Sequence, residues 1–161
     1  MNYRILTYEQ IDRTEWSRLV QASATGTWFQ TPEAYEFFAS MPALFVPFVF
    51  AVTGTHESDS GAMNEETLRG VCVGYVTKEK SPIKQFFTRR AIIIGGPAFA
   101  DDASLEEVEL LMNGVKELTS ERINGAPIYI ETRNFHDYSR WKEAFAKAGF
   151  EYRKHLNFHI D

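Results

Sequence analysis

Residues 91–94, Ala-Ile-Ile-Ile, form an unbroken apolar run that ends at a Gly-Gly-Pro turn. A strand with one buried face alternates apolar and polar residues, whereas a continuous apolar run is typical of a central strand covered on both faces. The run therefore predicts a sheet with a layer on each side, and this restricts the chain to an α/β architecture.

The segment after the turn predicts the longest helix. Ser104 and Glu107 have the spacing of a capping box, and the apolar side chains that follow have helical spacing: Leu105, Val108, Leu111, Met112, Val115 and Leu118. Shorter helices are predicted from Asp12 or Thr14, and from Asp137 to a stop at Gly149.

Strands are predicted at 3–7, 46–54, 68–79, 91–94, 127–133 and 156–160, with a polar loop at 55–66. The resulting order, β-α-α-β-β-β-α-β-α-β, resembles that of the GCN5-related N-acetyltransferase (GNAT) fold, except that the final strand of that fold is missing here. It implies a central mixed β-sheet flanked by helices on both faces. Three layers follow if the 104–123 helix and the helix around Trp141 cover opposite faces of the sheet.

The composition fits one ordinary globular domain. The chain has 161 residues, of which 44% are hydrophobic and 24% charged. No apolar run approaches the roughly 18 residues of a transmembrane helix, and the N-terminus lacks a signal-peptide core, so a cytoplasmic protein is expected. The net charge of −5 argues against the basic surface that stand-alone nucleic-acid binders usually have.

Cysteine and histidine give no metal site. Cys72 is the only cysteine and lies in an apolar run, where a small buried thiol is expected. His155 and His159 lie about 13 Å apart on a strand at roughly 3.3 Å per residue, too far for one ion to bridge. His136 precedes Asp137, and it is either a loop residue or a base in a cleft that opens there.

The Gly-Gly-Pro turn is where an acyl-CoA enzyme of this fold would hold a pyrophosphate, on backbone N–H groups at the positive end of a helix. Pro97 has no such donor, and acidic residues cluster at the helix start: Asp101, Asp102, Glu106 and Glu107. Carboxylates there repel a phosphate, so acetyl-CoA bound in the usual way is disfavoured. Gly95 and Gly96 serve either tight-turn geometry or the close approach of a ligand.

Three further groups are candidate binding residues. The segment 77–90 carries five basic residues that are either solvated strand ends or phosphate contacts: Lys78, Lys80, Lys84, Arg89 and Arg90. Glu131 and Arg133 follow a strand core, and they are either binding groups at a strand end or a structural ion pair.

The third group surrounds a helix start in GTWFQTPEAYEFF, residues 26–38. Thr31 is a good N-cap, Pro32 fits the first helical position, and the helix presents one apolar face: Ala34, Phe37, Phe38 and Met41. This face belongs either to the core or to a pocket rim. On a rim, Gln30 and Tyr35 supply the polar tips.

With the segments 92–97, 127–135 and 141–161, this stretch resembles the first half of a FemAB-type protein. These proteins are peptidoglycan interpeptide-bridge aminoacyltransferases related to the acetyltransferase fold. The resemblance covers nearly the whole chain. It implies transfer of an amino acid from aminoacyl-tRNA to an amine of a peptidoglycan precursor, in a cleft shared with a second GNAT-like domain.

On this interpretation, residues 1–161 are the N-terminal half of a two-domain protein and are inactive alone. The alternatives are an acyl-CoA-dependent N-acetyltransferase and a non-catalytic binding module that uses the sheet edge and the basic segment. No catalytic residue is assigned. An unpaired last strand would offer an edge for a homodimer.

Overall fold

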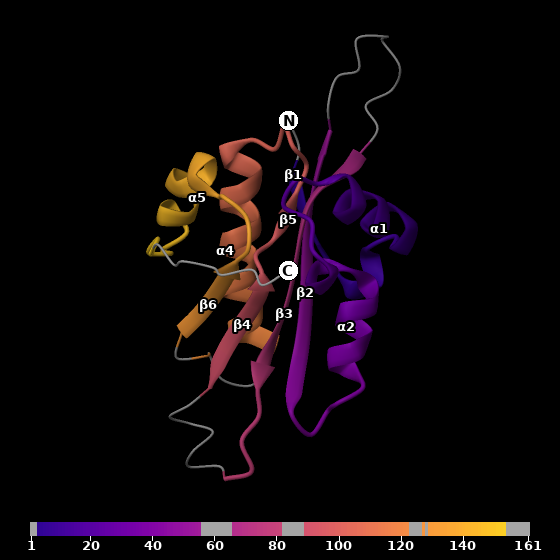
Figure 1. The fold of residues 1–161 in the computed structure, drawn as a ribbon, viewed down its shortest axis with the longest axis vertical. Coiled ribbons are helices and arrows are strands. Elements are labelled where there is room, and N and C mark those ends of the chain that lie inside the picture. Colours follow the sequence, from indigo (N-terminus) through magenta and orange to yellow (C-terminus); the bar gives the residue numbers. More distant parts are fainter. Residues whose placement is uncertain (1–2, 56–65, 82–88, 123–126, 128, 154–161) are drawn as a thin grey trace, which may run out of the picture.

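A mixed six-stranded sheet separates two pairs of helices (Figure 1). The computed structural model describes residues 3–55, 66–81, 89–122, 127 and 129–153, and the structural statements below concern these residues. The predicted strand at 156–160, with His155 and His159, lies outside them, as does Lys84. The α/β fold with helices on both faces of a mixed sheet is confirmed.

The predicted strands that the structure describes follow the predicted order, and one short strand at Ala98–Phe99 was not predicted. Four antiparallel neighbours come first, and the last strand joins parallel to the fourth, while a short strand pairs with the third. They are β1 (Tyr3–Thr7), β2 (Phe45–Thr55), β3 (Glu66–Thr77), β4 (Arg90–Gly95), β5 (Ala98–Phe99) and β6 (Tyr129–Asn134).

The helices begin at the predicted caps. Asp12 accepts a hydrogen bond from the Glu15 amide at 2.8 Å and starts α1 (Arg13–Ala22). Thr31 accepts from the Ala34 amide at 3.2 Å and starts α2 (Pro32–Ala39) after the 3-10 turn η2 (Trp28–Gln30). The Ser104 capping box starts α4 (Leu105–Arg122). These local predictions are confirmed, because each depends on residues only three apart.

The last helix begins later than predicted. Asp137 Oδ1 accepts from the Ser139 amide at 2.8 Å, but Tyr138 is the N-cap of a 3-10 turn, η3 (Ser139–Trp141), and α5 (Lys142–Lys147) starts only after it. Two aromatic residues anchor the chain ahead of α5. The Tyr138 hydroxyl donates to Pro97 O at 2.6 Å, and the Trp141 indole donates to Ala103 O at 3.1 Å. The helix ends in a Schellman motif at Gly149, where φ is +91°, as predicted.

The distribution of helices over the two faces also differs from the prediction. The long helix α4 and the helix α5 lie on the same face, and α1 and α2 cover the other (Figure 1). The crossover from β4 to the parallel β6 places α4 on one face. The chain after β6 then packs α5 beside α4, where Lys116 Nζ donates to Ala148 O at 3.1 Å.

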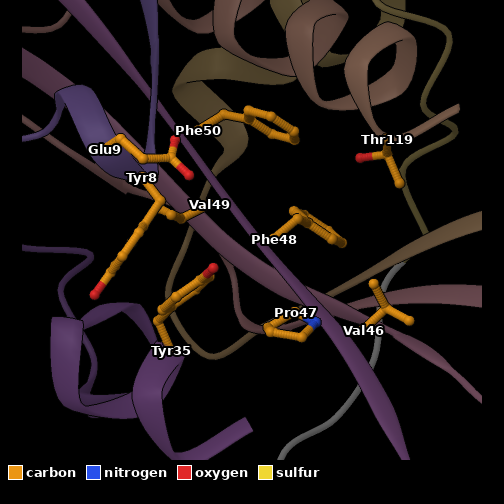
Figure 2. Close-up of a pocket in the computed structure, with 9 residues that line it drawn as sticks. All are labelled: Tyr8, Glu9, Tyr35, Val46, Pro47, Phe48, Val49, Phe50 and Thr119. Atoms are coloured by element: carbon orange, nitrogen blue, oxygen red, sulfur yellow. The ribbon is translucent and has the colours of Figure 1, made fainter. Parts of the chain in front are cut away.

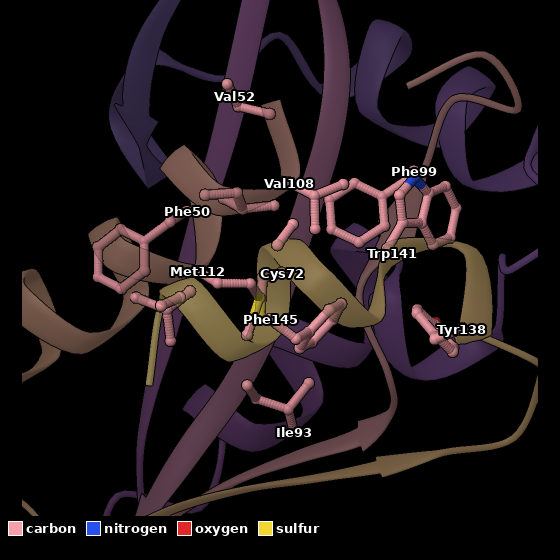
Figure 3. Close-up of a cluster of buried hydrophobic side chains, with 14 of the residues drawn as sticks. Phe50, Val52, Cys72, Ile93, Phe99, Val108, Met112, Tyr138, Trp141 and Phe145 are labelled. Atoms are coloured by element: carbon pink, nitrogen blue, oxygen red, sulfur yellow. The ribbon is translucent and has the colours of Figure 1, made fainter. Parts of the chain in front are cut away.

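Each face has its own core. The cluster under α4 and α5 contains Phe50, Cys72, Ile93 and Met112 together with the aromatic anchors of α5 (Figure 3). Cys72 is completely buried, as predicted, and burial raises the pKa of its thiol. None of the helices in the described part of the chain is long and apolar enough to cross a membrane.

Candidate functional site

Within the described residues, neither α1 nor α2 packs over β6 on the sheet face that carries these two helices. Those helices pack on β1, β2 and β3, whereas on β6 Tyr129 and Arg133 are about half exposed and Glu131 is partly exposed. Phe135 follows β6 directly, and its ring centroid lies 6.0 Å from that of Phe29 in η2. We call this surface the shelf; it consists of Trp28, Phe29, Phe37, Tyr129, Glu131, Arg133 and Phe135.

Aromatic rings form one wall of the shelf. Trp28 contacts Phe29 at 5.4 Å and Phe37 at 5.9 Å, both edge to face. Trp28 and Phe37 are each 51% exposed. Ala34 and Phe38 of α2 are buried whereas Phe37 is not, so the predicted apolar face is divided between the core and the surface. Successive residues point roughly 100° apart around an α-helix, so Phe37 points away from the direction of Phe38 and contacts Trp28.

Gln30 lies behind this wall and is completely buried. Its Nε2 donates to Val73 O at 3.1 Å and to Ile94 O at 3.0 Å, and its Oε1 accepts from Val73 N at 2.8 Å. The amide thus links β3 and β4 beyond the two residue pairs that join their backbones. Gln30 acts as a structural cross-link in this position, which agrees with the core alternative.

Tyr35 borders a cavity far smaller than a substrate site. Its ring stacks on Tyr8 at 4.4 Å, and both lie on one side of β2 while Thr119 lies on the other (Figure 2). The cavity holds about 70 Å³, enough for a few waters, whereas ligand pockets usually exceed about 300 Å³. A role for Tyr35 in substrate binding stays a prediction.

A larger cavity of about 860 Å³ follows the outer edge of β6. Glu131, Asn134 and His136 line it from the strand side, and Lys142 and Tyr152 line it from α5 and the segment beyond. Its size is that of a small-molecule site. His136 is exposed on this cavity, so a cleft does open beside it.

Glu131 and Arg133 meet on the shelf. Arg133 Nε donates to Glu131 Oε1 at 2.8 Å, and this bond raises the pKa of the guanidinium. Both side chains remain partly exposed, at 51% for Arg133 and 35% for Glu131. Tyr75 of β3 lies close enough to interact electrostatically with both, and burial raises the pKa of its hydroxyl. The two residues form an ion pair and are also accessible to a ligand.

The Gly-Gly-Pro turn is packed by protein groups. Gly95 and Gly96 have φ values of +81° and +82°, which favour glycine. A Cβ on Gly95 would clash with Thr27 Oγ1, and one on Gly96 would lie 2.5 Å from the Tyr138 hydroxyl. Tight-turn geometry and internal packing therefore account for both glycines.

The start of α4 holds a buried ionic network. Glu107 has no exposed surface, and its Oε1 accepts from Arg69 Nε at 3.0 Å. Arg69 also donates to Asp102 Oδ1 at 2.7 Å. Burial lowers the pKa of Arg69, but the hydrogen bonds to the two carboxylates outweigh it and the net shift is upward. Arg69 therefore stays charged and paired inside the protein.

These residues do not fit the CoA pyrophosphate that the fold family implies. The Ser104 amide at the helix start already donates to Glu107 Oε2 at 2.7 Å. Strands β4 and β6 stay paired up to Gly95 and Asn134, and the Phe135 amide extends this pairing by donating to Gly95 O at 3.2 Å. The Ser104 amide is therefore not available to a phosphate, and the paired ends of β4 and β6 leave no gap between them.

The basic residues of 77–90 are spread over separate positions. Lys78 Nζ donates to Pro42 O at 2.7 Å, and Lys80 is exposed beyond β3. Arg89 is half-buried, and Arg90 donates to the Tyr129 hydroxyl at 3.2 Å, which raises the pKa of Arg90. Their contact with phosphates stays a prediction. Among the described residues, no group of three histidine, cysteine or acidic side chains could hold a metal ion.

Three solved structures with this fold are acetyltransferases or are described as probable ones. A putative acetyl transferase from Pyrococcus furiosus matches with a TM-score of 0.58 and 16% identity, over 99% of this chain and 100% of that chain. A probable acetyltransferase matches with a TM-score of 0.53 and 16% identity, over 100% of this chain and 97% of that chain. An aminoglycoside N-acetyltransferase in complex with CoA matches with a TM-score of 0.53 and 11% identity, over 99% of this chain and 98% of that chain.

The class that follows is the GNAT-like acyltransferase fold. At these identities the likeness shows the fold alone. No family model matches the chain, and no curated protein sequence matches it either. The comparisons contain nothing that points to FemAB proteins, so this resemblance stays a hypothesis.

Two parts of this site were not predicted from the sequence. Arg69 lies inside a strand, and nothing in its neighbourhood signals a partner 38 residues away. Phe135 was not singled out either, although its place one residue after a strand of alternating charges could have drawn attention to it. The role of each residue depends on a contact with a segment that is distant in the sequence.

Proposed function

We propose that this chain is an N-acyltransferase domain that binds its amine acceptor on the shelf. The observation that carries the proposal is the exposed row of side chains on β6, the outer strand of the parallel pair with β4, which includes a carboxylate and lies beside an aromatic wall. Ligands of open α/β sheets bind near the carboxyl ends of the strands. The fold of the acetyltransferases supports an acyl-transfer reaction.

The groups on the shelf suit an amine. Glu131 offers a carboxylate to an ammonium group, and Trp28 and Phe37 offer ring faces that attract a cation. Acyl transfer needs the amine in its neutral form, a group that takes its proton and donors for the oxyanion. We assign Glu131 the binding of the amine and leave the base and the oxyanion donors unassigned.

The finer proposal rests on the sequence resemblance to FemAB proteins. In it, the donor is aminoacyl-tRNA, the acceptor is an amine of a peptidoglycan precursor, and a second GNAT-like domain completes a cytoplasmic enzyme. The residues Lys78, Lys80 and Arg90 would then contact donor or acceptor phosphates. The acid-filled turn supports a donor other than a CoA thioester held at α4.

The second candidate is an acyl-CoA-dependent N-acetyltransferase. It is favoured by the coverage of the structural matches, because the chain spans 97–100% of the first three matched acetyltransferase chains. In that case CoA must bind away from the start of α4. Tyr35, Gly95 and Gly96 would contribute to substrate binding only through the packing described above.

A thermal-shift screen tests the proposal with a nucleotide-linked muropeptide, acetyl-CoA and CoA. A ligand at about 100 times its Kd stabilises the folded state by about 2.7 kcal/mol, so a shift is measurable. We expect a shift with the muropeptide that is lost in Glu131→Gln. The matched control is Glu143→Gln, which removes a carboxylate from the exposed surface of α5.

Each outcome separates the candidates. A shift with acetyl-CoA alone would replace the FemAB-type proposal by the acyl-CoA enzyme. A muropeptide shift that is equal in Glu131→Gln and Glu143→Gln would remove the shelf from the proposal. A muropeptide that binds the shelf but is not acylated when aminoacyl-tRNA and the second domain are supplied would indicate a binding module.

A further inference from the structure

We infer that the Glu107 carboxylate is a built-in anion, which takes the place that a ligand phosphate would take at the start of α4. The chain consequently holds no CoA pyrophosphate at this turn. The inference concerns the turn between β4 and α4 and does not depend on the proposed acceptor site. It is carried by three independent sets of contacts.

The first set involves the helix start. The free N–H groups and the dipole at a helix N-terminus attract an anion. In this chain the Ser104 amide donates to Glu107 Oε2 at 2.7 Å, and the Glu107 amide donates to Ser104 Oγ at 3.2 Å. The Glu107 side chain is completely buried. The anion that satisfies the helix start therefore belongs to the helix itself.

The second set involves the cation. Arg69 reaches the turn from β3 with its side chain only 10% exposed. Guanidinium groups commonly bind phosphates through paired N–H donors. Here one nitrogen donates to Glu107 at 3.0 Å and another to Asp102 at 2.7 Å. A cation that would suit a pyrophosphate is thus paired with two carboxylates.

The third set fixes the turn in this arrangement. Ser23 Oγ donates to Phe99 O at 2.6 Å, and the Ala24 amide donates to Asp101 Oδ1 at 3.0 Å. The Tyr138 hydroxyl donates to Pro97 O from the opposite side. The backbone at Pro97 and Phe99 and the side chain of Asp101 are held by the residues that follow α1 and by the segment before α5, so the turn keeps its arrangement around the carboxylate.

The test follows the backbone amides of Gly96 and Ser104 by two-dimensional NMR during titration with inorganic pyrophosphate and with CoA. In the unaltered chain we expect neither amide to move. Glu107→Gln keeps the size and a hydrogen-bond acceptor, removes the charge and leaves Arg69 paired with Asp102. We expect pyrophosphate then to shift both amides, with affinity raised roughly ten-fold or more, the effect of one charge-assisted hydrogen bond.

Two further variants keep the inference open to refutation. Glu106→Gln, one residue earlier and exposed, should give no gain, and a gain equal to that of Glu107→Gln would mean that net charge alone is responsible. If Glu107→Gln does not fold, Asp102→Asn decides, since Asp102 is 77% exposed and its removal frees one guanidinium nitrogen. Movement of the Ser104 amide with CoA in the unaltered chain would overturn the inference, as would a folded variant without any gain.

Discussion

The turn before α4 and the shelf both adjoin the strands β4 and β6, yet the polar groups of the turn are buried whereas those of the shelf are exposed. At the turn, Glu107, Arg69 and the Ser104 amide satisfy one another in the interior. On the shelf, Arg133 and Glu131 pair at the surface beside half-exposed rings. Within one fold, a position suited to a ligand can thus become structural, while the capacity for recognition lies where the side chains of β6 are exposed.

The largest expected effect comes from the buried ion pair at the turn, and the pair on the shelf is its comparison. Arg69→Ala leaves the buried Glu107 carboxylate without its cation, and we expect a loss of about 3–5 kcal/mol in the free energy of unfolding. Arg133→Ala breaks the half-exposed shelf pair, and a loss below about 1 kcal/mol is expected. Urea denaturation measures both. Equal losses would erase the difference between the two regions.

The turn glycine gives the next effect. Gly96→Ala places a Cβ 2.5 Å from the Tyr138 hydroxyl at a φ of +82°, and we expect a loss of about 3 kcal/mol. Gly149→Ala is the matched control, because its φ is also positive but its nearest contact is Lys116 Nζ at 3.9 Å. About 1 kcal/mol is expected there. If the two variants unfold at the same urea concentration, the turn is not tightly packed.

Gln30 lies between the two regions, behind the aromatic wall. Gln30→Met keeps a similar volume but removes the hydrogen bonds to Val73 and Ile94, and we expect a loss of about 2 kcal/mol. Hydrogen exchange of the Val73 amide should become faster in the folded protein. Unchanged exchange of this amide would show that the backbone closes the gap without the side chain.

The shelf itself should give the smallest effect on stability. Trp28→Ser removes a ring that is 51% exposed and contacts Phe29 and Phe37, and the free energy of unfolding should fall by about 1 kcal/mol. The muropeptide-induced thermal shift should nevertheless fall, because the ring faces the acceptor in the proposed site. A large loss of stability would instead show that the wall belongs to the core.

Local patterns were sufficient for much of the fold. The caps at Asp12, Thr31 and Ser104 depend on residues three positions apart, and the run at 91–94 predicted its two covered faces. The packing of α5 beside α4 could not be read in this way, since it depends on the crossover to β6 and on where the anchored Tyr138 and Trp141 reach the core.

The candidate site was predicted in part. The acidic residues around Glu107 indicated a poor phosphate site from charge alone, whereas their buried partner Arg69 comes from another strand and leaves no local signal. The pattern could not decide between core and rim for Gln30 or Phe37. That choice depends on which side chains of η2 and α2 pack against the sheet, which is a property of tertiary packing.

The complete burial of Cys72 makes this chain convenient to label. Only a thiolate reacts with alkylating reagents, and this side chain has no exposed surface, so its modification requires the sheet to open. The rate of alkylation in the native protein would therefore count the openings of the core. A thiol introduced by Tyr129→Cys would react at once, so a dye or spin label placed there would sense shelf occupancy without background from Cys72.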